Sequence, residues 1–212
     1  MVDYSGFFGE HAVRLEHFGF PAAVSELRAL VDANACEEDL QRHLTRHPYI
    51  LSQQFGHCHH VFPKVSLGGR YEPDFFCLNI PSPGKQWIGV EIEPPGLSVV
   101  TKAGRRTAKL EHALQQVRDW RAWVRENLST ARGVPQKGGI GLEDIDPDFP
   151  GWVIVGRRAN FTDKFNELRK QIERDERILV RSWDGVLDWA DKRATHWSRH
   201  AVTLVGKAIG RD

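Results

Sequence analysis

The chain has 212 residues, of which 41% are hydrophobic and 27% are charged, so it is long enough and apolar enough to bury a substantial core. Its 29 basic and 28 acidic side chains give a net charge of +1, which excludes recognition of nucleic acid by an overall positive field. Three cysteines are too few for a disulfide framework, and neither a signal peptide nor an apolar run of about 18 residues is apparent. We therefore expect a cytoplasmic protein that does not enter a membrane.

The first half of the chain predicts two helices followed by three strands. Apolar side chains recur at helical spacing in residues 21–33 and 37–47, and Pro48 ends the second of these helices. Three β-rich runs follow, separated by turns rich in Gly and Pro, at residues 61–65, 74–78 and 86–93. The short turns between the runs predict a meander of antiparallel strands.

The second half predicts alternating helices and strands. A long helix is expected over residues 105–128, and the segment 129–150 is rich in Gly, Pro and Asp, which indicates a surface loop. The remaining elements are expected in the order strand, helix, strand and helix, at residues 152–155, 161–175, 178–183 and 184–200. This order predicts an α/β fold in which helices flank a mixed central sheet.

Acidic side chains gather at the ends of two of the expected strands. In the run QWIGVEIE, strand alternation places Glu91 and Glu93 on the same face, about 7 Å apart at a rise of roughly 3.3 Å per residue. Trp87 and Gly89 share that face. Asp74 begins the preceding strand, so a hairpin between the two strands would bring its carboxylate close to Glu91.

Three carboxylates at one end of a sheet repel one another unless a cation lies between them. Hard divalent cations such as Mg²⁺ and Mn²⁺ prefer oxygen ligands of this kind, and a bound cation can activate water at a phosphodiester. Two other interpretations stay open from the residues alone. The strand face could simply be solvated, or a buried acid could be paired with Arg or Lys for structural reasons.

The long helix carries polar side chains that could reach the acids. Lys109, His112 and Gln116 lie on one side of it, and Lys109 and Gln116 fall at the margin of the apolar stripe. Side chains at such positions can extend over the end of a sheet. The simpler alternative is that they cover the boundary of the core while their polar ends remain in water.

Two basic clusters also follow expected strands. Lys102, Arg105 and Arg106 lie between the acidic strand and the long helix, and Arg157 and Arg158 follow the strand WVIV. If both clusters face the acids, they could hold phosphates through charge-assisted hydrogen bonds. These five residues are therefore candidates for nucleic-acid binding. The alternative is that they are simply solvated, as basic residues in loops usually are.

Five runs, taken in order, resemble a known family. They are EEDLQRHLTRHPYIL, EPDFF, GVEIEPP, KLEHALQQVRDWRAW and WVIVGRR, and the similarity covers roughly residues 36–183. They resemble the C-terminal nuclease domain of Shedu anti-phage defence proteins, within the PD-(D/E)XK nuclease superfamily. The resemblance implies a restriction-endonuclease-like core with the order α-β-β-β-α-β. The chain would then divide into an N-terminal helical extension, residues 1–35, and a nuclease-like domain, residues 36–212.

The resemblance also implies roles for particular residues. Asp74 and Glu91 would bind the metal, and Gln116 would border the active site from the long helix. Glu37 would supply a further acidic contact from the helix that precedes the sheet. Helical spacing supports this choice, because Glu37 shares the face of the apolar residue Leu40.

The chain departs from the superfamily pattern at Glu93. In that superfamily the third-strand signature usually ends in a lysine, which orients the attacking water and stabilises developing charge. A glutamate cannot do this, although it could bind a second metal or deprotonate water. Lys109 from the long helix, or Lys102 from the preceding loop, could replace the missing lysine.

We therefore predict a Mg²⁺- or Mn²⁺-dependent endonuclease that acts on DNA, with Glu93, Lys109, Gln116 and Glu37 completing the catalytic site. The alternative is a nuclease-fold module that binds DNA or a partner as a sensor or regulatory subunit without cutting. Glu93 is the residue that keeps this alternative open. The resemblance further implies that the protein forms a homo-oligomer.

Overall fold

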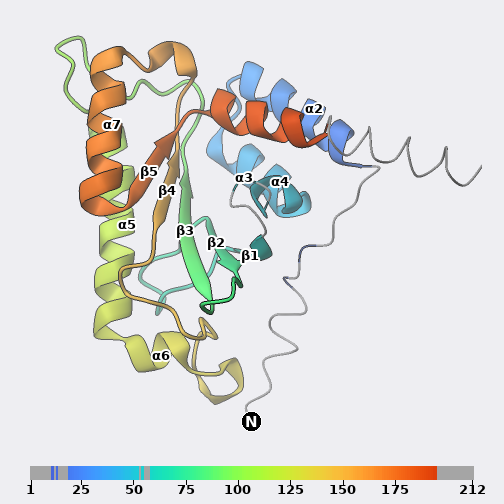
Figure 1. Cartoon of the computed structure of the whole chain (residues 1–212), viewed down its shortest axis with the longest axis vertical. Helices are drawn as coiled ribbons and strands as arrows, with labels where there is room; N and C mark the ends of the chain where they lie inside the picture. Colours follow the sequence, from blue (N-terminus) through green and yellow to red (C-terminus); the bar gives the residue numbers. More distant parts are fainter. Residues whose placement is uncertain (1–10, 12, 14–18, 53, 55–57, 195–212) are drawn as a thin grey trace, which may run out of the picture.

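The computed structural model describes residues 11, 13, 19–52, 54 and 58–194. Within them, one five-stranded sheet is covered by helices on both faces (Figure 1). The strands, in their order across the sheet, are β1 (Cys58–Pro63), β2 (Phe75–Asn79), β3 (Gln86–Ile92), β4 (Gly151–Ile154) and β5 (Ile178–Arg181).

Two groups of helices flank this sheet. One face is covered by α2 (Phe20–Asp32), α3 (Glu37–Arg46), α4 (Tyr49–Ser52) and a helix over residues 183–194. The other face is covered by α5 (Ala108–Glu126) and α7 (Asp163–Glu176), with the short α6 (Leu128–Arg132) beyond the end of α5. Two 3₁₀ turns, η2 (Pro135–Lys137) and η3 (Arg158–Asn160), lie in the connections. The predicted α/β fold with a mixed sheet flanked by helices is confirmed.

The sheet changes direction at β3. The strands β1, β2 and β3 form the predicted antiparallel meander, with Phe75 of β2 opposite Val90 of β3. The strands β3, β4 and β5 are parallel, and α5 and α7 make the crossover connections that parallel strands require. Hence β3 is paired on both sides, and its carboxyl end lies beside that of β4.

The alternation of side chains along β3 divides the core in two. Val90 belongs to the apolar cluster under α2 and α3, whereas Trp87 packs in the cluster under α5. Gly89 shares the face of Trp87, and a Cβ atom added to it would lie 2.8 Å from a ring carbon of Phe149 and 3.3 Å from one of Trp120. Close packing between β3 and α5 therefore requires a glycine at this position.

Side-chain caps decide where two of the helices begin. The hydroxyl oxygen of Thr107 accepts a hydrogen bond from the N–H of Leu110 (3.4 Å) at the start of α5, and Thr162 accepts one from Phe165 (3.2 Å) at the start of α7. The helix α3 ends before Pro48, as predicted. No helix among the described residues combines the length with the apolar character that a membrane crossing requires.

The long helix differs from the prediction at both ends. It was expected over residues 105–128, but the Thr107 cap delays its start and Asn127 ends it. The Asn127 side-chain nitrogen donates to the backbone oxygen of Trp123 (2.9 Å), and local bonds of this kind compete with continued helix. The segment 129–150, expected to be a loop, therefore contains most of α6 and the turn η2.

Three other elements also differ from the prediction. The single-turn helix α4 follows Pro48 and was not expected, because four residues are too few to show helical spacing. The strand β1 begins at Cys58, three residues before the predicted start at 61. The last predicted helix, 184–200, begins at residue 183, and its residues 195–200 lie outside the described part of the chain.

The packing at Gly89 can be tested by substitution. Gly89→Ala is expected to lower the free energy of unfolding by about 1–3 kcal/mol, because the added methyl group must displace Phe149 or α5. Gly96→Ala is the matched control, since a Cβ atom there meets its nearest neighbour, Asn34 Oδ1, at an ordinary 3.6 Å. Urea denaturation measures both variants. Equal stability of the two would contradict tight packing at Gly89.

Candidate metal centre

Three buried acids lie at the carboxyl end of β3. Asp74 directly precedes β2, and the register of β2 with β3 places it opposite Glu91. Glu93 directly follows β3; its N–H donates to the backbone oxygen of Ile154 (2.8 Å), and its carbonyl accepts from the Trp183 indole N–H (2.8 Å). The exposed fractions of the three acids are only 2%, 5% and 6%, so they do not form a solvated strand face.

Lys64 is a site residue that the sequence-based prediction missed. Its Nζ lies 2.6 Å from Asp74 Oδ1, while Asp74 Oδ2 accepts a hydrogen bond from the N–H of Ile92 (2.9 Å). Both oxygens of this carboxylate are therefore engaged. The pairing of Pro63 with Phe75 puts Lys64 next to Asp74, so the antiparallel register of these two strands is the signal that identifies the lysine.

Burial and mutual repulsion raise the pKa values of the acids. Burial, followed by the charges of Asp74, Glu37 and Glu93, raises the pKa of Glu91 to about 10. Burial and the charge of Glu37 raise the pKa of Glu93 to about 7, against the opposing effect of Lys109. Hence Glu91 holds a proton at neutral pH unless a cation takes the place of that proton.

The first turns of α3 and α5 supply the charges around these acids. Glu37 begins α3, where burial and the charge of Asp74 raise its pKa. Lys109 is exposed in the first turn of α5, and its charge acts on both Glu37 and Glu93. Gln116 is half-buried about two turns further along α5, and within the described residues it makes no hydrogen bond to the acids.

The arginines that follow β4 are engaged by acids of the same chain. Arg157 forms ion pairs with Asp184 (2.9 Å) and Asp32 (3.0 Å), and Arg158 pairs with Asp188. These partners belong to α2 and to the helix over residues 183–194. The two arginines therefore tie that helix to the end of β4, in addition to any role toward phosphate.

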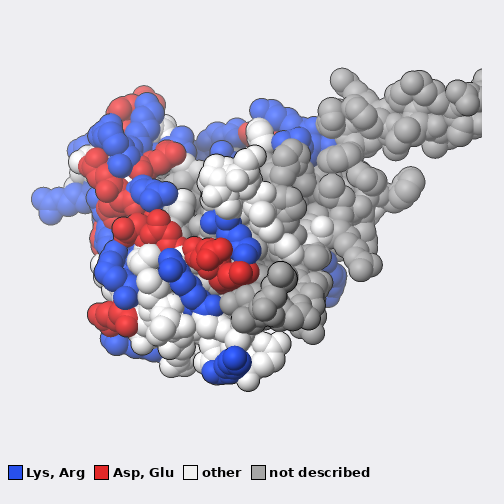
Figure 2. All heavy atoms as spheres, turned by 60° about the horizontal axis from the view of Figure 1, so that its bottom comes forward, with Lys and Arg blue, Asp and Glu red and all other residues white. Residues whose placement is uncertain are grey.

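The basic residues between β3 and α5 are placed differently. Lys102 and Arg105 are exposed, whereas Arg106 pairs with Glu111 (2.9 Å) in the first turn of α5. Elsewhere the charges are mixed: basic and acidic side chains are interspersed over the face that Figure 2 presents. This mixture agrees with the net charge of +1 and indicates that any phosphate contact depends on local groups.

The acids form a donor set that suits a hard divalent cation. Carboxylate oxygens are the preferred ligands of Mg²⁺ and Mn²⁺, and a cation here would offset the burial and the repulsion that together raise the pKa of Glu91. Asp74 and Glu91 lie opposite each other and could share it, with Glu93 and Glu37 close by. A cation at Asp74 Oδ1 would compete with the ammonium of Lys64 for that oxygen.

Comparison of the chain with models of known protein families shows to which family it belongs. The family model described as Shedu protein SduA, C-terminal, matches residues 34–187. The chain belongs to this family. The resemblance to the C-terminal domain of Shedu proteins is thus confirmed, and membership of the Shedu family implies a role in anti-phage defence. The matched region contains all five strands and the three buried acids. A search of curated proteins finds no match.

The raised pKa of Glu91 predicts how stability depends on pH. Between the ordinary value of 4.5 and about 10, the folded state holds a proton that the unfolded chain has released, so the free energy of unfolding falls as pH rises. Glu91→Gln removes this titration. In metal-free buffer at pH 8, which is about 3.5 pH units above the ordinary value of 4.5, it is expected to raise the free energy of unfolding by at most about 5 kcal/mol, with little effect near pH 4.5.

Chemical denaturation at several pH values, in the presence of a chelator, measures this effect. The control is Glu126→Gln, an exposed glutamate at the far end of α5, which should leave the pH dependence unchanged. A stability curve for Glu91→Gln that runs parallel to the wild-type curve from pH 5 to pH 8 would show that Glu91 does not hold the proton.

Proposed function

We propose that the chain is a metal-dependent endonuclease that acts on DNA, in the cytoplasm, as its part in anti-phage defence. The observation that carries the proposal is the burial of Asp74, Glu91 and Glu93 together at the end of β3, beside Lys64. Buried carboxyl groups resist ionisation, and several of them at one point are more typical of a functional site than of a structural one. The order α3, β1, β2, β3, α5, β4 supports a nuclease-like core.

Asp74 and Glu91 would hold Mg²⁺ or Mn²⁺, because they face each other across β2 and β3. When bound, such a cation lowers the pKa of water and offsets the charge of a phosphodiester. Glu91 must release its proton to serve as a ligand, so the affinity for metal should rise with pH. Glu37, at the start of α3, would provide a further acidic contact.

Glu93 would accept the proton of the attacking water. Its pKa of about 7 is suitable, because a general base acts best when its pKa lies near the working pH. Lys64 would take the part of the missing superfamily lysine, since its ammonium contacts the site directly and would be released from Asp74 when a cation binds there. Lys109 and Gln116 would position the phosphate or the water from α5.

DNA would be held through its phosphates. Lys102 and Arg105 are exposed in the connection between β3 and α5 and can meet the DNA backbone without breaking an ion pair. Arg106, Arg157 and Arg158 would first have to exchange an acidic partner for a phosphate. We therefore expect the first two residues to contribute more to affinity. A homo-oligomer is a further part of the proposal, and light scattering tests it.

The second candidate function is DNA or partner binding without cleavage. The observation that favours it is Glu93, which stands where the superfamily has a lysine and which burial keeps partly protonated near neutral pH. A module of this kind would bind DNA in Mg²⁺, Mn²⁺ or Ca²⁺ and leave it intact under every condition. Ca²⁺ separates binding from cleavage, because it occupies acidic sites but supports such hydrolysis poorly.

Substitution of the acids tests the proposed cleavage. The purified wild-type chain should nick or cut DNA with Mg²⁺ or Mn²⁺, and Asp74→Asn and Glu91→Gln should each reduce the rate by about 10²-fold or more. Glu126→Gln should retain full activity. The measurement is conversion of supercoiled plasmid, with thermal unfolding to verify that the variants are folded. Cleavage that survives both acidic substitutions would contradict the assignment.

A comparison of two lysines tests which of them serves the reaction. Lys64→Met should reduce cleavage by about 10²-fold, because it removes a positive charge in contact with the acids, whereas Lys109→Met should cost about tenfold or less. Single-turnover rates at saturating metal measure the chemical step. If Lys109→Met reduced the cleavage rate more than Lys64→Met did, Lys109 of α5 would be the lysine that serves the reaction.

A further inference from the structure

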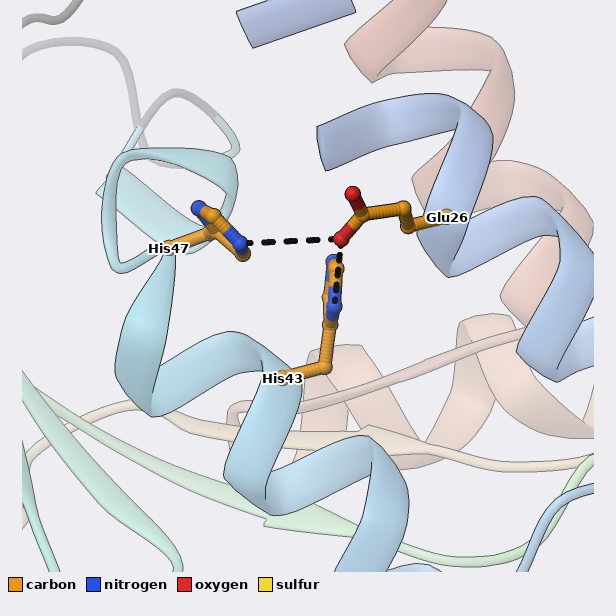
Figure 3. Close-up of side chains that lie close together, drawn as sticks. All are labelled: Glu26, His43 and His47. Atoms are coloured by element: carbon orange, nitrogen blue, oxygen red, sulfur yellow. Dashed lines mark ion pairs between the residues drawn. The ribbon is translucent and has the colours of Figure 1, made fainter. Parts of the chain in front are cut away.

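A second group of metal-ligating side chains lies on the helical layer, where α2 crosses α3. Figure 3 shows the carboxylate of Glu26, from α2, directed between the rings of His43 and His47 at the end of α3. Glu26 Oε2 lies 3.9 Å from His43 Nδ1 and 3.9 Å from His47 Nε2. The three candidate ligand atoms all lie within 4.8 Å of one another. The two histidines are four residues apart, so they project from the same side of the chain.

The other ring nitrogen of each histidine is already held. His43 Nε2 lies 3.0 Å from the backbone oxygen of Ala23, which can only accept, so Nε2 carries the hydrogen. His47 Nδ1 lies 2.8 Å from the hydroxyl oxygen of Tyr49, which can accept as well. Outer contacts of this kind fix the tautomer and the ring orientation of histidines that bind metals.

An ordinary ion pair does not account for this arrangement. Once His43 Nε2 carries the hydrogen, the neutral ring turns a lone pair at Nδ1 toward the Glu26 carboxylate, so that two acceptors face each other. The 3.9 Å separations are too long for hydrogen bonds. Burial lowers the pKa of His43, which disfavours the protonated ring that an ion pair would need. A cation between the three side chains would accept electron pairs from the two ring nitrogens and from the carboxylate oxygen.

We propose that Glu26, His43 and His47 bind Zn²⁺. Two imidazole nitrogens and one carboxylate oxygen suit zinc rather than Mg²⁺ or Ca²⁺, which select oxygen ligands. Tetrahedral zinc with bonds of about 2.1 Å separates its ligands by about 3.4 Å. The Glu26 oxygen therefore needs to approach each ring nitrogen by about 0.5 Å, and the two ring nitrogens, which lie within 4.8 Å of each other, by at most about 1.4 Å. Water from the adjoining pocket of about 550 Å³ takes the fourth position.

The charged side chains around this site determine its affinity for zinc. The pocket is also lined by Arg42 and Arg46, and the charge of Arg46 acts against a cation at His43. Arg42 is partly offset by its ion pair with Asp39 (2.7 Å). Glu26 therefore supplies the negative charge that a zinc complex needs here. The bound ion would fasten α2 to α3, the helix whose first residue is Glu37.

The experiment measures zinc binding by the full chain after treatment with a chelator. Titration against a chromophoric competitor should give one tightly bound Zn²⁺ per chain, and zinc should raise the thermal unfolding temperature. Glu26→Gln and His47→Gln should each weaken binding at least about tenfold. Co²⁺ should give the intense visible bands of a tetrahedral complex in the wild type and lose them in both variants. Asp74→Asn is the control for the other centre and should bind zinc normally.

The sequence run HCHH at residues 57–60 is the competing source of zinc ligands. A double variant, Cys58→Ser with His59→Gln, should therefore keep the zinc stoichiometry and the cobalt spectrum of the wild type. Absence of a tight site in the wild type would overturn the proposal. So would undiminished binding by Glu26→Gln and His47→Gln, or loss of zinc in the double variant alone.

Discussion

The rest of the structure depends on keeping several carboxyl groups together in a buried site where one ammonium group, that of Lys64, makes direct contact with them. Lys64 and the N–H of Ile92 bind the two oxygens of Asp74, and Glu91 opposite it retains a proton to a pKa of about 10. This arrangement is poor for stability, because ionising either glutamate at the end of β3 works against burial and neighbouring negative charge. A bound cation would remove the conflict, which is the physical reason to regard these acids as a metal centre.

The topology of the sheet makes this concentration of charge possible. Because β3 has a partner on each side, its end is held by an antiparallel neighbour that brings Asp74 and by a parallel neighbour that binds the backbone of Glu93. The helices α3 and α5 both begin close to the acids, since Glu37 and Lys109 lie in their first turns and act on Glu93. The amino-terminal ends of helices carry partial positive charge, which favours anions at that end of the sheet.

Features that depend on local spacing could be predicted well. The alternation of QWIGVEIE placed the acids on one face, and the helical period located α2, α3 and α7 to within about two residues. Features that depend on competition between a side chain and the backbone could not be predicted. Asn127 is the example, because its side chain bonds to the backbone of Trp123 where α5 ends and α6 begins. The residues of the candidate site also divide into those that local spacing predicts and those that it does not. Asp74, Glu91 and Glu93 could be found from their strands, whereas Lys64 required the register between β1 and β2.

By itself, the sequence determined the order of the strands and of the longer helices, the faces of β3 and the family to which the chain belongs, because these follow from short-range patterns of residue type. Only the tertiary structure decided that Arg157 pairs with Asp184 and that Glu26 meets His43 and His47. Those contacts join separate helices and strands, and no local spacing encodes them. The tertiary structure also decided the protonation of the acids at the end of β3, because burial and neighbouring charge exist only in the folded chain.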